Sequence, residues 1–170
     1  MSDGPVSDER ATRTVPFSGP WFHARERAAV GAALEGRVGG DGPMGKRVEK
    51  RLEDALSAHR VLLTTSCTHA MELALMALGV GPGQEVICPS FTFVSTANAV
   101  LRVGARPVFA DIEETTLGLD PADVERRITG RTAAVMPVHY TGVAPDMETL
   151  LDLSRRHHLK VIEDAAQALG

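Results

Sequence analysis

EVICPSFTFVSTANAVLRVGARPVFAD, residues 85–111, contains the pattern that decides the fold of this chain. Residues 85–89 are a nearly continuous apolar run that predicts a strand, 92–104 predict a helix, and 106–111 predict a second strand. Because two strands separated by a helix of this length normally run parallel, the stretch predicts a parallel pair joined by a crossover helix.

The same alternation continues on both sides of this stretch. Further strands are predicted at 60–64, 132–139 and 160–165, and further helices at 22–37, 46–59, 67–79, 121–128 and 146–158. Five short, mainly apolar strands that alternate with helices predict an α/β fold. We expect three αβα layers, with a mainly parallel sheet covered by helices on both faces.

Composition and charge exclude several classes of function. The 170 residues are 44% hydrophobic, enough for one domain with a core, and the net charge of −4 offers no basic surface to nucleic acid. No apolar run approaches the ~18 residues of a membrane span, and residues 1–15 are expected to be a flexible polar tail without a secretory signal. Cys67 and Cys88 make no disulfide framework, so a cytoplasmic protein is expected. No metal-ligand spacing emerges either, so no metal is expected.

Ligands of parallel sheets bind at the carboxyl ends of the strands, so the polar residues that follow the strands are the candidate site. The first group is Ser66, Cys67 and Thr68, at the start of the helix predicted over 67–79. Ser66 or Thr65 can cap this helix, and the same N–H groups and hydroxyls can hold a phosphate; the stretch alone fits both. Cys67 could also act as a nucleophile with a lowered pKa, although the sequence shows no arrangement of His and Asn that would activate it.

An aromatic residue follows the strand predicted at 85–89. The ring of Phe91 can stack on a planar ligand there or pack in the core. Phe93 and Val94, which come next, are expected to pack inwards.

Acidic residues end the strand predicted at 160–165. A carboxylate at Asp164 is costly to bury unless it meets a cation or a strong donor, such as a protonated heteroaromatic nitrogen; otherwise Asp164 is a helix cap. Gln167 lies three residues on, within reach of a ring hydroxyl. His139, the last residue of the strand predicted at 132–139, is either a strand-end hydrogen bonder or a pocket residue. A phosphate cradle, a stacking aromatic ring and a strand-end aspartate together describe a pocket for pyridoxal 5'-phosphate.

The motifs GDGPMGKRVEKRLE, SCT, PSFTFVSTANA, PVHYTGVAPDM and EDAAQ occur in this order. In this combination the chain resembles the DegT/DnrJ/EryC1/StrS family of sugar aminotransferases, and most of all those that make dTDP-4-amino-4,6-dideoxygalactose. The resemblance covers about residues 16–170. It implies the N-terminal part of the large domain of a type I, aspartate aminotransferase-like, pyridoxal phosphate-dependent fold.

The resemblance also implies a role for each matching residue. Ser66, Cys67 and Thr68 match the phosphate-binding turn, and Phe91 matches the aromatic residue stacked on the pyridine ring. Asp164 matches the aspartate that pairs with the pyridinium nitrogen. Gln167 matches the residue near the ring oxygen. The implied partners are a nucleotide sugar, an amino-acid donor such as glutamate, and a second copy in a homodimer.

The chain departs from the family pattern at the Schiff-base lysine, which in the family lies downstream of EDAAQ. The chain's lysines are Lys46 and Lys50, on or beside a predicted surface helix, and Lys160, at the opposite end of the strand from Asp164. No catalytic residue is therefore assigned.

The missing lysine leads us to expect the N-terminal portion of an aminotransferase, lacking the rest of the large domain and the small domain and inactive alone. Two alternatives stay open. One is a non-catalytic remnant or interaction protein of this fold. The other is a dehydratase of the family, with histidine in place of the lysine.

Overall fold

A computed structural model describes Gly19 and residues 22–36, 39 and 42–169. The chain falls into two compact units, divided between Leu62 and Leu63. The tail expected at 1–15 lies outside the described residues.

The first unit contains two helices, close to the two that the sequence predicts. They are α1 (Ala24–Leu34) and α2 (Pro43–Leu56). The α2 helix begins three residues before the predicted range, because proline with its fixed φ is favoured in the first turn. It ends at Ser57, which has a left-handed φ of 51°.

The second unit is a parallel sheet that alternates with helices. Its strands are β1 (Glu85–Pro89), β2 (Arg106–Ala110), β3 (Thr132–Val135) and β4 (Lys160–Val161), and its helices are α3 (Cys67–Ala77), α4 (Ser95–Arg102), α5 (Pro121–Arg127) and α6 (Met147–Arg156). The strand order is β2-β1-β3-β4, and every pair is parallel. All carboxyl ends therefore lie along one edge.

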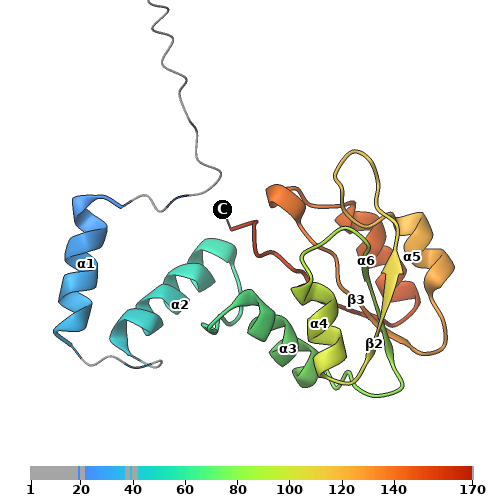
Figure 1. Cartoon of the computed structure of the whole chain (residues 1–170), viewed down its shortest axis with the longest axis horizontal. Helices are drawn as coiled ribbons and strands as arrows, with labels where there is room; N and C mark the ends of the chain where they lie inside the picture. The colour runs from blue at the N-terminus through green and yellow to red at the C-terminus, as the bar shows by residue number, and fades with distance from the viewer. Residues whose placement is uncertain (1–18, 20–21, 37–38, 40–41, 170) are drawn as a thin grey trace, which may run out of the picture. The chain divides into compact units, whose positions relative to one another are not determined.

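Helices cover both faces of this sheet, α3 and α4 on one side and α5 and α6 on the other (Figure 1). Residues alternate along each strand: Val86 and Cys88 of β1 pack towards α3 and α4, whereas Ile87 packs towards α5 and α6. All five residues of β1 are buried. The predicted three-layer α/β fold with a parallel sheet is confirmed.

The prediction of a strand at 60–64 is wrong. Leu62 and Leu63 are 71% and 46% exposed, and none of the described strands pairs with this segment. A strand exists only if a neighbour satisfies its backbone groups, whereas here the Val61 N–H donates to the Glu53 side chain at 3.2 Å. The other strands are confirmed. Beyond β3 and β4, pairing continues only as an isolated bridge between Val138 and Asp164.

Candidate functional site

A pocket of about 300 Å³ lies at the carboxyl edge of the sheet in the second unit. Its walls come from the start of α3, the turn between β1 and α4, and the segments that follow β3 and β4. Four of the six residues proposed from the sequence line it: Cys67, Thr68, Asp164 and Gln167. Asp111, which follows β2, is not among the lining residues. The described residues contain no group of His, Cys, Asp and Glu side chains that could hold a metal ion.

The N-terminus of α3 forms one wall of the pocket. Ser66 is its N-cap, and the Ser66 Oγ accepts a hydrogen bond from the His69 N–H at 3.2 Å, so the predicted cap is confirmed. The N–H groups of Cys67 and Thr68 meet no acceptor among the described residues. Free N–H groups and the positive end of a helix dipole attract anions, and the hydroxyl of Thr68 adds a donor.

Asp164 supplies a carboxylate that is only 5% exposed. Thr96 Oγ1 donates to Asp164 Oδ2 at 2.8 Å, and Thr92 Oγ1 lies 2.7 Å from Thr96 Oγ1. The other oxygen, Oδ1, accepts from the Ala166 N–H at 3.3 Å and from the Cys67 Sγ at 3.5 Å. Buried carboxylates need donors of this kind. The backbone of Asp164 is held in the sheet, because its N–H donates to the Pro137 carbonyl at 2.9 Å.

The thiol of Cys67 points at this carboxylate. Burial, the negative charge of Asp164 and the hydrogen bond to it raise the pKa of the Cys67 thiol. A nucleophilic cysteine requires the opposite shift, towards the thiolate. Burial, together with the charge of the neighbouring carboxylate, therefore disfavours the thiolate that a Cys67 nucleophile would need.

A turn at Tyr140–Gly142 lies beside Gln167. Gln167 Oε1 accepts a hydrogen bond from the Thr141 N–H at 2.7 Å. Thr141 has a left-handed φ of 54°, which is unusual for a β-branched residue and is found where surrounding contacts hold the backbone. Gly142 also has a positive φ, and a Cβ there would lie 3.2 Å from the Gln167 carbonyl. The turn and the Gln167 segment are thus closely fitted.

His139 belongs to the pocket, a point that the sequence left open. Its backbone N–H donates to the Asp164 carbonyl at 3.1 Å, so His139 is also a strand-end hydrogen bonder. Its Nε2 lies 3.0 Å from Glu163 Oε2 but makes no aligned hydrogen bond with any described residue.

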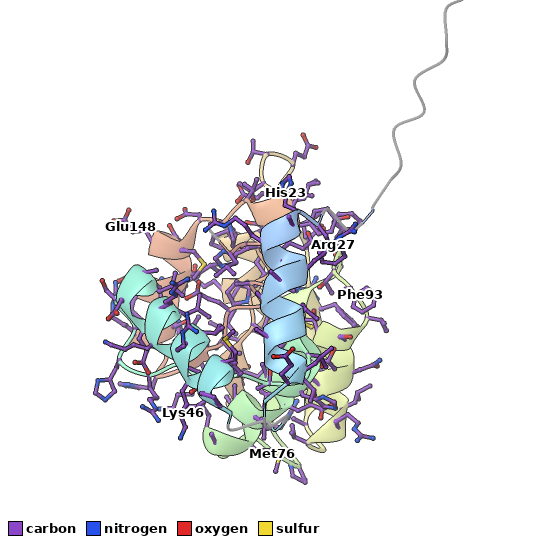
Figure 2. The ribbon with its side chains drawn as sticks, turned by 90° about the vertical axis from the view of Figure 1, so that its left-hand side faces the viewer. His23, Arg27, Lys46, Met76, Phe93 and Glu148 are labelled. Carbon is purple, nitrogen blue, oxygen red and sulfur yellow. The ribbon has the colours of Figure 1, made fainter. Side chains whose placement is uncertain are left out.

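The aromatic residues differ from expectation. Phe91 packs on Tyr140, which lines the pocket, with ring centroids 4.6 Å apart and planes tilted by 50°, but Phe91 itself is not among the lining residues. Phe93, expected inside, is 73% exposed and lines the pocket; Figure 2 shows it at the periphery beside the start of α4. Val94 is 60% exposed, so this prediction is also wrong. The reason is that 90–94 cross the carboxyl edge as a turn, outside the layer between α4 and the sheet.

Sequence reasoning missed Thr92 and Thr96. Both occur in PSFTFVSTANA, and their spacing of four residues within the helix predicted at 92–104 would place both hydroxyls on one side. This spacing was the available signal. The acceptor of Thr96, Asp164, lies 68 residues further along the chain, and only the fold brings the two together.

The fold defines the class of protein. Solved structures with this arrangement are pyridoxal phosphate-dependent aminotransferases, and the described sheet is part of their large domain. The chain belongs to the DegT/DnrJ/EryC1/StrS aminotransferase family, whose sequence model matches residues 21–170.

Three relatives give the extent of the similarity. The spore coat polysaccharide biosynthesis protein SpsC of Bacillus subtilis (strain 168) is 42% identical over 161 residues, or 95% of this chain and 41% of SpsC. DesV of S. venezuelae, in complex with a ketimine intermediate, is 39% identical with a TM-score of 0.82, over 85% of this chain and 39% of DesV. NtdA from Bacillus subtilis, with bound cofactor PMP, is 42% identical with a TM-score of 0.75, over 76% of this chain and 30% of NtdA. The chain thus spans 41% of the length of its curated relative SpsC, and the comparisons favour an aminotransferase over a sugar dehydratase.

Proposed function

We propose that this pocket holds the pyridine ring and the phosphate of pyridoxal 5'-phosphate. The observation that carries the proposal is the Asp164 carboxylate, which is buried at the pocket and receives hydrogen bonds from neutral donors only among the described residues. A buried negative charge without a cation is unfavourable, and the protonated nitrogen of a pyridine ring would supply the cation. The volume of about 300 Å³ is at the lower end of the range for small-molecule sites.

Each residue predicted from the sequence has a part in this proposal. The N–H groups of Cys67 and Thr68 and the hydroxyls of Ser66 and Thr68 hold the phosphate at the start of α3. Phe91, supported by Tyr140, offers its ring face to the pyridine ring. Gln167 lies where it can donate to the ring oxygen through its amide nitrogen, because its Oε1 is held by the Thr141 N–H.

When bound, the cofactor supplies an electron sink for a substrate carbon that loses a proton. The part of Asp164 is to hold a proton on the ring nitrogen. The backbone pairing beyond β3 and β4, between Val138 and Asp164, fixes the backbone of Asp164 at the pocket.

We further propose that the reaction moves an amino group from an amino acid, with glutamate as the expected donor, to a dTDP-4-keto-6-deoxyhexose. Support for a sugar substrate comes from membership of the family and from the similarity to a polysaccharide biosynthesis protein. We propose a homodimer working in the cytoplasm, where free thiols such as Cys67 and Cys88 stay reduced. No helix in the described part of the chain has both the length and the apolar character to cross a membrane.

Lysine positions limit what this part of the protein contributes. Lys160, the lysine of the unit that carries the pocket, lies at the start of β4, at the opposite edge of the sheet from Asp164. We therefore propose that residues 63–170 provide the cofactor-holding half of a site and that Lys160 takes no part in it.

Pyridoxamine 5'-phosphate is the sharpest probe, because it has an amine in place of the aldehyde, cannot form a Schiff base with a lysine, and therefore reports the non-covalent contacts alone. In the protein expressed from its own gene, calorimetry should give saturable binding, and Asp164→Asn should weaken it about ten- to hundredfold, the ~1.5–3 kcal/mol of a hydrogen bond to a charged group. Asp146→Asn is the matched control, since it makes the same chemical change at the cap of α6, outside the pocket. Equal affinity in wild type and Asp164→Asn would remove Asp164 from the site.

The reaction is tested separately. Transamination between glutamate and a dTDP-4-keto-6-deoxyhexose should depend on Asp164 and be unaffected by Asp146→Asn. Binding without transamination of this pair would leave the cofactor site in place and reject the proposed substrates.

A further inference from the structure

We infer that Thr96 is a positioning residue, which fixes the Asp164 carboxylate through one oxygen so that the other faces the ligand. The inference rests on the proposed function and adds a residue to which that function gives no part of its own. The Thr96 residue is fully buried, at 0% exposure, and its hydroxyl meets Asp164 Oδ2 at 2.8 Å. The carboxylate is therefore tied to the first turn of α4, on a different segment of the chain from its own.

The direction of the hydrogen bonds follows from counting protons. A threonine hydroxyl has one proton, and the Thr96 proton is donated to Asp164 Oδ2. The 2.7 Å contact between the Thr92 and Thr96 hydroxyls then requires Thr92 to donate to Thr96. The two hydroxyls thus form a relay in which each O–H points towards the carboxylate, and consecutive hydrogen bonds of this kind strengthen one another.

The two carboxylate oxygens are held unequally. Oδ2 has the short bond from Thr96, whereas Oδ1 has only long contacts, 3.3 Å to the Ala166 N–H and 3.5 Å to the Cys67 Sγ. Oδ1 therefore keeps an acceptor site for a stronger donor. A ring N–H placed in the pocket would be that donor. Without Thr96, the carboxylate could rotate about its Cα–Cβ and Cβ–Cγ bonds and lose this orientation.

Two substitutions separate the hydroxyl from the shape of the side chain. Thr96→Val keeps the branched shape and removes the donor, while Thr96→Ser keeps the donor and removes the methyl group. If the hydroxyl positions Asp164, Thr96→Val should bind pyridoxamine 5'-phosphate about tenfold more weakly, on the scale of a charge-assisted hydrogen bond, and Thr96→Ser should bind nearly as wild type.

A second readout separates positioning from a purely structural role. The absorption of bound pyridoxamine 5'-phosphate, followed against pH, reports when its ring nitrogen loses the proton. A carboxylate that has rotated away no longer holds this proton, so the transition should move to lower pH in Thr96→Val and return in Thr96→Ser. A merely structural threonine would change the unfolding free energy and leave this transition in place.

The outcomes distinguish this inference from the proposed function. If Asp164→Asn weakens binding but Thr96→Val keeps the wild-type affinity and pH transition, the inference about Thr96 is overturned and the cofactor site stands. If Asp164→Asn itself has no effect, the proposed function fails first. Should Thr96→Val not fold, Thr92→Val decides. It removes the donor behind Thr96 at a partly exposed position, and it should move both readouts in the same direction by a smaller amount; an unchanged Thr92→Val protein would then overturn the inference.

Discussion

Cys88 is a residue of the core whose titration is displaced by burial. It is fully buried in β1 between the sheet and the helices α3 and α4, and burial raises the pKa of its thiol from 9.0 to about 12. Because the unfolded thiol ionises first, the stability that Cys88 contributes is complete below about pH 9 and declines as the pH rises towards 12.

This shift predicts an alkaline loss of stability that a neutral substitution removes. Between pH 9 and pH 10, the unfolding free energy of the wild type should fall by about 1 kcal/mol more than that of Cys88→Ala. Urea unfolding at pH 8, 9 and 10 measures the difference, and the variant corrects for the pH dependence of every other group, which is common to both proteins. Parallel curves would mean that the thiol is not the group responsible.

At the scale of single residues, the sequence could predict a site residue where a polar side chain occurs at a position that is expected to be buried. Asp164 was predictable, because a carboxylate at the end of a buried strand needs a partner. Thr96 was not, because a threonine in a helix is ordinary and its acceptor is remote in the sequence. Phe93 was misplaced because an aromatic residue resembles core until the path of the turn is known.

At the scale of elements, a single carboxylate holds together the amino edge of the sheet. Glu85 begins β1, and its side chain is 3% exposed. It accepts hydrogen bonds from Thr129 Oγ1 at 2.7 Å and from Arg131 at 2.8 Å, and Arg106 of β2 lies 3.6 Å away. The hydrogen bonds from Thr129 and Arg131 and the charges of the two arginines hold the pKa of Glu85 below its ordinary value.

Glu85→Gln should therefore destabilise the sheet at neutral pH by about 1–3 kcal/mol, because it leaves a neutral amide among groups arranged for a charge. A lowered carboxyl pKa gives stability that is present above the unfolded value of 4.5 and lost as the pH falls through the folded value, so the difference from wild type should shrink in acid. Thermal unfolding from pH 7 to pH 3 measures it. Glu114→Gln, at an exposed position, is the control for net charge; a pH-independent difference would reject the ionic account.

Helices, whose backbone hydrogen bonds form within the element, were predictable from the sequence. Strands, whose backbone hydrogen bonds need a neighbouring strand, were less predictable. All six helices fall close to their expected ranges, since caps and apolar periodicity are local signals. The segment 60–64 has the composition of a strand, but a strand needs a partner, and composition does not say which segment provides it. The strand order β2-β1-β3-β4 likewise cannot be predicted from local sequence patterns.

At the scale of the molecule, apolar side chains remain on the outer surface of α3. Leu73 and Met76, three residues apart, are 55% and 65% exposed. Contiguous exposed apolar surface favours association. The protein should therefore self-associate with rising concentration, and the charge-neutral pair Leu73→Lys with Met76→Glu should reduce this.

Sedimentation velocity across a range of concentrations tests this prediction. Leu151→Lys, at a 38% exposed leucine on α6, is the control and should leave the distribution unchanged. A wild-type protein that sediments as a monomer at every concentration would contradict the expectation.

The connection of β1 to β2 through α4 has a consequence for the order of folding. These two strands are neighbours both in the sheet and along the chain, so their pairing closes a short loop and loses little chain entropy. Thr96 is carried by α4, inside this local unit, whereas Asp164 follows β4, which is also the last described strand to leave the ribosome. We expect the hydroxyl to be in place before the carboxylate is synthesised, so the pocket is completed only when the segment after β4 docks on the unit of β1, α4 and β2 that precedes it in the chain.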